Sequence, residues 1–356
     1  MNRPINAVVL GASGYIGGEL LRLIAGHPNF NLLTAVSESF QGQTIDSQFP
    51  ALAHSYADDT FVSFESAQAT LAALPDNHKL AVFSAAPHGA SASVVASILR
   101  CAQDNSLDIH VVDSSADFRY ETAASFKTVY KIDHAAPELL DQFSCALPEH
   151  MPSATTPHIG HPGCFATASL LAAVPLFAHG LAEPEIFISG ITGSTGSGRS
   201  PTGGTHHPER HSNLYAYKPL SHRHAPEVRA LIRNASNEQV SVHFIPHSGP
   251  FARGIYVTLQ ARLKTDTSES DVRQVFKDFY DNSVFAHVVD GIPRLKDVVA
   301  SNYCHIGIAT EGRQVVVMSA IDNLVKGAAG GAIQWMNRLW SLPETNGLTA
   351  AAPAWT

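Results

Sequence analysis

Asn6-Ala7-Val8-Val9-Leu10-Gly11-Ala12-Ser13-Gly14-Tyr15-Ile16-Gly17-Gly18 is the stretch that decides the fold of this 356-residue chain. Its apolar start predicts a buried strand, its glycines predict a tight turn, and the residues from about Glu19 to Ala25 predict a helix. Strand, glycine turn and helix in this order are the context of a dinucleotide-binding loop, whose glycines let the backbone approach a pyrophosphate at the helix N-terminus. We therefore assign cofactor binding to Gly11, Ser13, Gly14, Tyr15, Ile16 and Gly17, with a tight turn that binds nothing as the alternative.

The same pattern of strand followed by loop or helix recurs over the first part of the chain. Residues 31–36, 79–84 and 109–113 are short apolar runs that we predict to be strands, and a helix follows the second of them up to about Cys101. Strands that alternate with helices predict a doubly wound parallel sheet, whose ligands bind beyond the carboxyl ends of the strands. The loops at 84–91 and 114–119 are therefore expected to belong to a ligand cleft.

Three residues in these loops are candidates for ligand binding. We place Pro87 and His88 of the first loop at the cofactor. Arg119 of the second loop carries a guanidinium that suits a phosphate or a carboxylate. A surface ion pair between Arg119 and Asp117 is an equal alternative.

The end of the second predicted strand gives a mixed signal about the adenosine ribose. An acidic residue here favours NAD, whereas small hydroxyl or basic residues accommodate a 2′-phosphate. Ser37 and Ser39 suit a phosphate and are assigned to the cofactor, whereas Glu38 suits NADP only if it points away. A solvated loop position for Glu38 is the alternative.

Cys164 lies in Gly160-His161-Pro162-Gly163-Cys164-Phe165-Ala166-Thr167, where a Pro/Gly turn leads into an apolar segment. A cysteine in the first turn of a helix meets unpaired N–H groups and the positive end of the helix dipole, which stabilise a thiolate. We interpret Cys164 as a nucleophile, against the alternative of a small buried hydrophobe.

The later chain predicts a second domain of a different class. Residues 186–192, 240–245, 254–261 and 314–319 read as strands suited to an antiparallel sheet, and a helix is expected over 270–280. A small-residue helix over 322–337 is expected to lie against the first domain.

The predicted fold class is α/β, with a Rossmann-type doubly wound parallel sheet followed by an α+β domain whose sheet is mostly antiparallel. We place the first domain at 1–160, completed by a helix at 325–345, and the catalytic and dimerisation domain at 161–324.

Two polar segments of the second domain offer further candidates. The Gly/Ser loop after 186–192 contains Ser197 and Arg199 and is suited to an anion, with a flexible linker as the alternative. A histidine-rich tract follows, with His206, His207, His222 and His224. These histidines suit either a metal site or an acid/base partner for Cys164. Because no cysteine or acidic ligand is spaced to complete a metal site, we predict no metal.

Composition excludes several classes of protein. The net charge is −8 and no long Lys/Arg run occurs, so nucleic acid is not an expected partner. The four cysteines show neither CxxC pairs nor disulfide density, which indicates a reducing compartment. The longest apolar run is too short for a bilayer, so we expect no membrane association and a cytoplasmic location.

Taken together, the motifs resemble those of the N-acetyl-γ-glutamyl-phosphate reductases, a branch of the aspartate-semialdehyde dehydrogenase-like family. The resemblance runs from Ala7 to about Glu344. The segments that carry it are Gly11-Ala12-Ser13-Gly14-Tyr15, Pro87-His88-Gly89, Asp113-Ser114-Ser115-Ala116-Asp117-Phe118-Arg119, Pro162-Gly163-Cys164, His222-Arg223-His224-Ala225-Pro226-Glu227, Arg253-Gly254-Ile255 and Asp322-Asn323-Leu324-Val325-Lys326-Gly327-Ala328.

The resemblance implies an NADP(H)-dependent reductase of a small acyl phosphate, acting through a thioester on Cys164. It implies His224 as the acid/base and His222 as its neighbour, although these two roles are interchangeable. It further implies Asn323 at the cofactor and a homodimer or homotetramer. The other candidates it suggests are Arg119, Ser197 and Arg199 for the phosphate, and Arg210 or Arg223 for a substrate carboxylate.

Three alternative functions remain open at this stage. Thr205-His206-His207-Pro208-Glu209-Arg210 and Tyr217-Lys218-Pro219 resemble sister enzymes that reduce carrier-bound aminoadipyl phosphate in lysine biosynthesis, rather than the arginine-pathway substrate. A non-catalytic NADP-sensing protein and a metal-dependent hydrolase are alternatives of other classes.

Overall fold

The computed structural model describes residues 4–354, which form two compact units. The first unit comprises the chain up to Cys145, then Ser153–His161 and Ala329–Leu348. The second comprises Ala146–Pro152, Pro162–Ala328 and the chain from Thr349 onward. Each unit is described by itself below.

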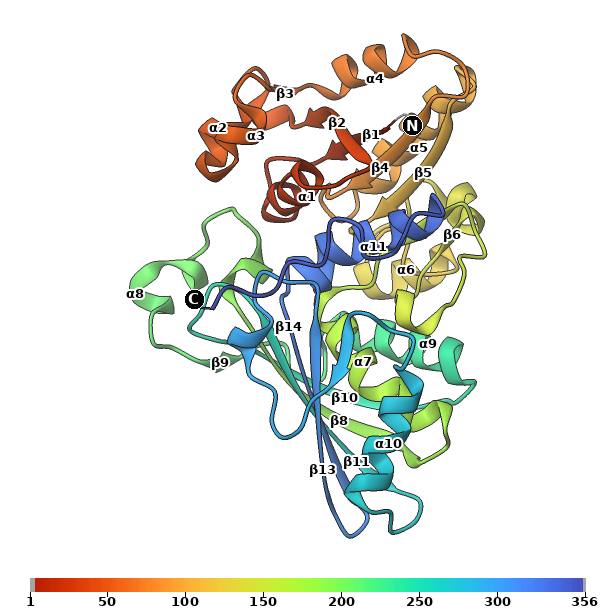
Figure 1. The fold of residues 1–356 in the computed structure, drawn as a ribbon, viewed down its shortest axis with the longest axis vertical. Coiled ribbons are helices and arrows are strands. Elements are labelled where there is room, and N and C mark those ends of the chain that lie inside the picture. The colour runs from red at the N-terminus through yellow and green to blue at the C-terminus, as the bar shows by residue number, and fades with distance from the viewer. Residues whose placement is uncertain (1–3, 355–356) are drawn as a thin grey trace. The chain divides into compact units, whose positions relative to one another are not determined.

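The first unit is built on one sheet of seven parallel strands (Figure 1). Its strands are β1 (Ile5–Leu10), β2 (Phe30–Val36), β3 (Phe61–Val62), β4 (Lys79–Ser84), β5 (Asp108–Asp113), β6 (Phe143–Ser144) and β7 (His158–Gly160). Their order is β3-β2-β1-β4-β5-β7-β6, so the chain winds outward in both directions from β1. The predicted doubly wound parallel sheet is confirmed, and its topological switch point lies between β1 and β4, where ligands of such sheets bind.

Helices cover this sheet and complete an apolar core. They are α1 (Tyr15–Ala25), α2 (Ile45–Gln48), α3 (Ala53–Tyr56), α4 (Phe64–Ala72), α5 (Ser91–Asp104), α6 (Ala123–Tyr130) and α11 (Gly330–Leu339). The C-terminal helix α11 contacts α1 and β5 within this unit. Helix α11 is buried over most of its length, and its small residues Gly330, Gly331 and Ala332 let it approach its neighbours closely.

Helix α1 begins at Tyr15, four residues before the helix expected from the sequence. Its first turn contains Gly17 and Gly18, and because glycine is a poor helix former, helix propensity predicted a later start. Packing overrides propensity here, because a Cβ on Gly17 would lie 2.5 Å from the carbonyl oxygens of Gly11 and Ala12.

The second unit contains a mixed sheet of seven strands in the order β12-β13-β14-β11-β8-β10-β9. They are β8 (Ala182–Thr192), β9 (Tyr215–Ala216), β10 (Ser241–Ser248), β11 (Ile255–Leu263), β12 (Ala286–Val288), β13 (Cys304–Glu311) and β14 (Gln314–Ile321). Most neighbours are antiparallel, as predicted, but β10 pairs with β8 in parallel and β12 with β13 in parallel. The antiparallel expectation for 240–245 was wrong because a helix lies between β8 and β10, and a helical crossover returns the chain in the same direction.

Four helices belong to the second unit: α7 (Cys164–Ala178), α8 (His207–Arg210), α9 (His224–Ser236) and α10 (Glu269–Phe279). Helix α7 is apolar on every side, and the side chains from Phe165 to Phe177 are buried. A helix that is apolar all round lies in a core. It contacts β11 and β14 on one side and α9 on another, so its first residue, Cys164, has a rigid base.

The single helix expected over 322–337 is divided in the structure. A π-helical turn over Val325–Ala329 precedes α11. The carboxylate of Asp322 accepts the N–H groups of Leu324 and Val325 at 2.8 and 2.9 Å, so it caps this segment. Over the described residues, none of the helices is both long and apolar enough to span a bilayer.

Candidate functional site

The glycine loop of the first unit has the geometry of a nucleotide cradle. Gly11 has a φ of +71°, and a Cβ there would lie 2.5 Å from the carbonyl oxygen of Ala85. A Cβ on Gly14 would meet nothing closer than 3.5 Å, so this glycine leaves space at the start of α1. A strained turn next to an open helix N-terminus fits a bound pyrophosphate.

Hydrogen bonds tie this loop to the ends of the neighbouring strands. The N–H of Ala12 donates to the carbonyl of Val36 at 2.9 Å, and the N–H of Ala85 donates to that of Leu10 at 2.8 Å. The hydroxyls of Ser13 and Ser37 lie 2.7 Å apart. The loop is therefore fixed at the carboxyl ends of β1, β2 and β4, where a dinucleotide binds in this type of sheet.

The loops at 84–91 and 114–119 are joined to one another by the side chains of His88 and Asp117. The N–H of Ala116 donates to Nδ1 of His88 at 3.0 Å. The Asp117 carboxylate accepts the N–H of Gly89 at 2.7 Å and that of Ala92 at 2.9 Å. The structure thus brings Pro87 and His88 to the same sheet edge as the glycine loop.

Arg119 is held by backbone carbonyl groups at the ends of two neighbouring strands. It is 7% exposed, and its guanidinium donates to the carbonyls of His161 and Ser114 at 2.8 and 2.9 Å. The carboxylate of Asp117 accepts backbone N–H groups of Gly89 and Ala92. Arg119 is therefore a buried side chain whose hydrogen bonds link the ends of β5 and β7.

In the second unit, Cys164 is the first residue of α7 and is partly exposed. The N-cap is Gly163, whose carbonyl accepts the N–H of Thr167 at 2.8 Å. The N–H of Gly163 donates to Oε1 of Glu227 at 2.6 Å, and Glu227 is 1% exposed. This buried carboxylate of α9 holds the entry to the cysteine helix in place, a role that sequence reasoning missed.

Other cysteines are less suited to nucleophilic chemistry. Cys304 is buried, and burial raises the pKa of its thiol far above the usual value. Burial also raises the pKa of Cys101. A thiol reacts as its thiolate, so a raised pKa makes these two residues weaker nucleophiles at neutral pH than an unperturbed cysteine.

A backbone turn presses against the other side of Cys164. A Cβ on Gly327 would lie 2.8 Å from the Cβ of Cys164 and 3.2 Å from its Cα, which is too close for any side chain. The N–H of Gly327 donates to the carbonyl of Asp322 at 3.0 Å, five residues back, as in a π-helix. π-Helical turns are frequent at functional sites.

Buried charges hold this turn. Nζ of Lys326 lies 2.6 Å from Oε1 of Glu149, and both side chains are 1% exposed. The Asp322 carboxylate is fully buried and forms a two-point pair with Arg253 at 3.0 and 3.2 Å. These pairs fix two residues that precede Gly327, and the sequence offered no signal for either pairing.

His222 and His224 lie together beside the cysteine helix. Their ring centroids are 4.7 Å apart, and they lie 5.9 and 6.3 Å from the ring of Phe165, the residue after Cys164. Nδ1 of His222 accepts the N–H of His224 at 3.2 Å, which assigns the proton of the neutral ring to Nε2. Burial, followed by the charges of Arg223 and Lys218, lowers the pKa of His222 to about 4, so this ring is neutral at pH 7.

Tyr217 is a further residue of this cluster. Its ring centroid lies 5.6 Å from that of His222. Burial and then the negative charge of Cys164 raise the pKa of its phenol well above the usual value, so it stays protonated. The hydroxyl therefore remains a hydrogen-bond donor beside His222, a role that its position in the polar tract did not by itself indicate.

The remaining candidates of the second unit are dispersed. Ser197 and Arg223 are exposed and Arg199 is half-buried. Arg210 is buried and donates to the carbonyl of Asn213 at 3.3 Å.

Asn323, expected at the cofactor, is 2% exposed. Its amide joins the N–H of Gly254 at 2.6 Å to the hydroxyl of Thr195 at 3.0 Å. Its visible role is to hold the Gly/Ser loop that contains Ser197. Among residues 4–354, no group of three or more His, Cys, Asp or Glu side chains is placed to bind a metal ion.

Comparison with known proteins assigns both units. Residues 6–154 match the family described as semialdehyde dehydrogenase, NAD binding domain, and residues 164–323 match semialdehyde dehydrogenase, dimerisation domain. The N-acetyl-gamma-glutamyl-phosphate reductase of Methanosphaera stadtmanae is 38% identical over 97% of this chain and 97% of that protein. The reductase of the same name from Methanopyrus kandleri is 38% identical over 96% of each. The chain belongs to the N-acetyl-gamma-glutamyl-phosphate reductase family.

Solved structures of the wider superfamily share the fold. Aspartate semialdehyde dehydrogenase II complexed with ASA from Vibrio cholerae has a TM-score of 0.70 and 14% identity, over 96% of this chain and 99% of that one. Aspartate semialdehyde dehydrogenase with NADP from Candida albicans has a TM-score of 0.65 and 15% identity, over 95% and 98%. At such identities the likeness concerns the fold alone.

Proposed function

We propose that this protein reduces N-acetyl-γ-glutamyl phosphate to N-acetylglutamate 5-semialdehyde with NADPH and releases inorganic phosphate, a step of arginine biosynthesis. The observation that carries the proposal is Cys164, partly exposed at the start of α7, with the paired imidazoles of His222 and His224 against the ring of the next residue, Phe165. Full-length relatives of the same family support the substrate.

The chemistry begins at the sulfur of Cys164. Its thiolate attacks the carbonyl carbon of the acyl phosphate, and the C–O bond to phosphate breaks, which leaves a thioester and inorganic phosphate. N–H groups at the start of α7 stabilise the oxyanion, an effect of roughly 3–4 kcal/mol for a good donor. When bound at the glycine loop, NADPH would supply the hydride for the thioester carbonyl. Collapse of the resulting thiohemiacetal releases the aldehyde and restores the Cys164 thiolate.

The two histidines have different roles in this scheme. His222 is neutral at pH 7 and carries its proton on Nε2, so it donates a hydrogen bond without giving up the proton. We assign the proton transfer itself to His224, the first residue of α9. Arg119, Arg199 and Ser197 are proposed to contact the phosphate of the substrate, and Arg210 or Arg223 its carboxylate. Ser197 and Arg223 are exposed, and Arg199 is half-buried.

NADP(H) is the proposed cofactor, held by the glycine loop of the first unit. Gly11, Ser13, Gly14, Tyr15, Ile16 and Gly17 form the loop and the start of α1, with Ser37, Ser39, Pro87 and His88 at the neighbouring strand ends. The turn at Gly11 and the space at Gly14 support this assignment. A reducing compartment keeps Cys164 as a thiol, so we place the enzyme in the cytoplasm.

Reduction of NADP⁺ by N-acetylglutamate semialdehyde and phosphate tests the proposed reaction in reverse. Cys164→Ser is expected to abolish the phosphate-dependent rate, whereas Cys145→Ser keeps it, and iodoacetamide is expected to label Cys164 first. A protein that binds NADP but shows no rate is a sensor. Activity with carrier-bound aminoadipyl phosphate alone moves the chain to lysine biosynthesis, and loss of activity on dialysis against a chelator indicates a metal enzyme.

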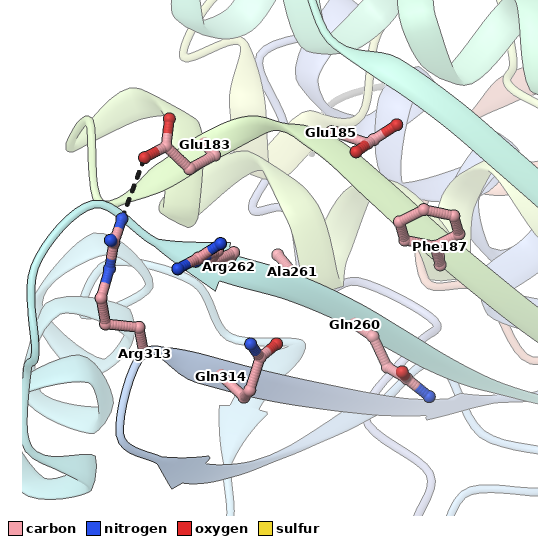
Figure 2. Close-up of a pocket in the computed structure, with 8 residues that line it drawn as sticks. All are labelled: Glu183, Glu185, Phe187, Gln260, Ala261, Arg262, Arg313 and Gln314. Atoms are coloured by element: carbon pink, nitrogen blue, oxygen red, sulfur yellow. Dashed lines mark hydrogen bonds and ion pairs between the residues drawn. The ribbon is translucent and has the colours of Figure 1, made fainter.

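We also propose that the protein is a homodimer formed through the exposed face of the second unit's sheet. Phe187 on β8 is 52% exposed and Ile245 on β10 is 39% exposed, although both lie within strands. Figure 2 shows Phe187 on the same surface as a pocket of about 590 Å³ over β8, β11 and β14.

The charges in this pocket suit a two-fold partner. Glu183 and Glu185 lie on β8. Arg313 pairs with Glu183 at 3.0 Å, and Arg262 lies on the neighbouring strand β11 (Figure 2). In a two-fold interface the same face of each copy meets the other, so a face that carries charges of both signs can pair with itself. The match of residues 164–323 to a dimerisation domain supports the same occupant.

Analytical ultracentrifugation tests the dimer. Phe187→Glu is expected to give a monomer, whereas Ile292→Glu, which changes a side chain that is 73% exposed outside the strands, leaves the dimer intact. Dimeric Phe187→Glu protein at micromolar concentration would contradict this interface.

A further inference from the structure

Glu38 lies where nucleotide-binding folds of this type distinguish NAD from NADP. It is the second residue after β2, and a carboxylate near this strand end ordinarily binds the ribose hydroxyls of NAD and repels the 2′-phosphate of NADP. No Lys or Arg occurs between Ser37 and Thr44 to offset that repulsion. A protein that uses NADP(H) must therefore direct this carboxylate elsewhere.

The structure shows where the carboxylate goes. Oε1 of Glu38 accepts the backbone N–H of Phe64 at 2.7 Å. Phe64 is the first residue of α4, a helix of nine residues whose N-cap is Ser63. The N–H groups and the dipole of a helix N-terminus stabilise a carboxylate, so this contact is favourable for a charged Glu38.

Neighbouring residues make this orientation a property of the sheet. The last residues of β2 pair with β3 in parallel, with Val36 opposite Val62, and the N–H of Ser37 donates to the carbonyl of Val62 at 3.0 Å. The chain that leaves β3 therefore begins α4 beside Glu38.

Ser37 and Glu38 point to different neighbours. The Ser37 hydroxyl lies 2.7 Å from that of Ser13 in the glycine loop, whereas the Glu38 carboxylate lies at α4. Ser37 is 6% exposed and thus part of the loop's structure.

We propose that the backbone N–H of Phe64 is a specificity-determining group, which holds the Glu38 carboxylate at α4 and so leaves the adenosine ribose site open to a 2′-phosphate. This inference rests on the proposed use of NADP(H). The exposed Ser39 is then free of an acidic competitor for the phosphate. The selectivity for NADP depends on a main-chain contact that no side-chain motif encodes.

Phe64→Pro removes the N–H that holds Glu38. Proline is accepted at the first position of a helix, and the extended ψ of 162° at Ser63 suits a residue before proline. Phe64→Ala is the matched control, because it loses the same partly buried ring but keeps the N–H. The comparison therefore isolates one hydrogen bond.

The readout is equilibrium binding of NADP⁺ and NAD⁺ to the full chain by calorimetry, with no acyl substrate present. Phe64→Pro is expected to weaken NADP⁺ binding by about tenfold or more relative to Phe64→Ala, since a released carboxylate repels a phosphate a few ångströms away. NAD⁺ binding is expected to stay the same or to tighten. Phe64→Pro combined with Glu38→Gln is expected to restore NADP⁺ binding.

Glu38→Gln alone keeps the test decisive if Phe64→Pro folds poorly. With the carboxylate already held at α4, this substitution is expected to change NADP⁺ affinity by less than about threefold. A tenfold gain in NADP⁺ affinity for Glu38→Gln overturns the inference. The same ratio of NADP⁺ affinity to NAD⁺ affinity in Phe64→Pro and Phe64→Ala also overturns it. Intact NADP⁺ selectivity without acyl-phosphate reduction counts against the proposed function alone.

Discussion

Replacement of Gly327 by alanine tests whether the π-helical turn positions the nucleophile. The added Cβ would lie 2.8 Å from the Cβ of Cys164, whereas carbon atoms in van der Waals contact are about 3.5–4.0 Å apart. Cys164 or the turn must then move by roughly 0.7–1.2 Å. The turn is held by the Lys326–Glu149 pair and by Asp322, so we expect most of the movement at Cys164.

A displacement of this size has a large effect on catalysis. A misplacement of about 1 Å costs about 10²-fold in rate, and overpacking of a core costs about 1–3 kcal/mol of stability. Gly327→Ala is therefore expected to lower kcat by roughly 100-fold, with a smaller change in KM. The rate of iodoacetamide labelling of Cys164 is expected to change as well, because the thiol shifts relative to the N–H groups of α7.

Steady-state kinetics, labelling rates and thermal unfolding measure these three effects. Gly26→Ala is the control, since a Cβ there meets nothing within 4 Å. If Gly327→Ala retains wild-type kcat and wild-type labelling, the turn does not position Cys164 and the reasoning fails.

Two further predictions concern buried ionisable groups. The native pKa of His222 is lowered from 6.5 to about 4, so the unfolded chain binds more protons between these values and stability falls as pH drops through that range. The wild-type free energy of unfolding is expected to fall by up to ~2 kcal/mol more than that of His222→Gln when the pH is lowered from about 7 to about 5. Urea titrations at the two pH values measure this difference, and the same pH dependence for both proteins would contradict the prediction. Lys326→Met leaves the Glu149 carboxylate buried without its cation and is expected to cost about 3–5 kcal/mol, part of which Glu149→Gln restores in the double variant. Denaturant titrations of the three variants measure this, and additive losses would argue against the pair.

Local patterns were sufficient for much of the fold. The apolar run before Gly11 gave β1, and the Pro/Gly turn before Cys164 gave the start of α7 at the residue expected. Both signals lie within a few residues of the element they specify. The parallel pairing of β10 with β8 was not predicted, because it depends on the crossover of the chain between them rather than on the alternation within either strand.

The residues that support Cys164 could not be found in this way. Glu227 contacts Gly163 across 64 residues of sequence, and Lys326 meets Glu149 across 177. From the sequence, Glu227 cannot be distinguished from an exposed acidic residue of an amphipathic helix. Nothing short of the packed structure shows that it accepts a backbone N–H.

The sequence by itself determined the class of chemistry: a dinucleotide loop, a cysteine at a helix start and a pair of histidines, because each depends on residue type at short spacing. Only the tertiary structure decided how these groups are held. Gly327 abuts Cys164, and the Glu38 carboxylate turns to α4, because segments remote in the chain pack against each other there. Contacts of that kind depend on position in space, which short-range patterns of residues do not specify.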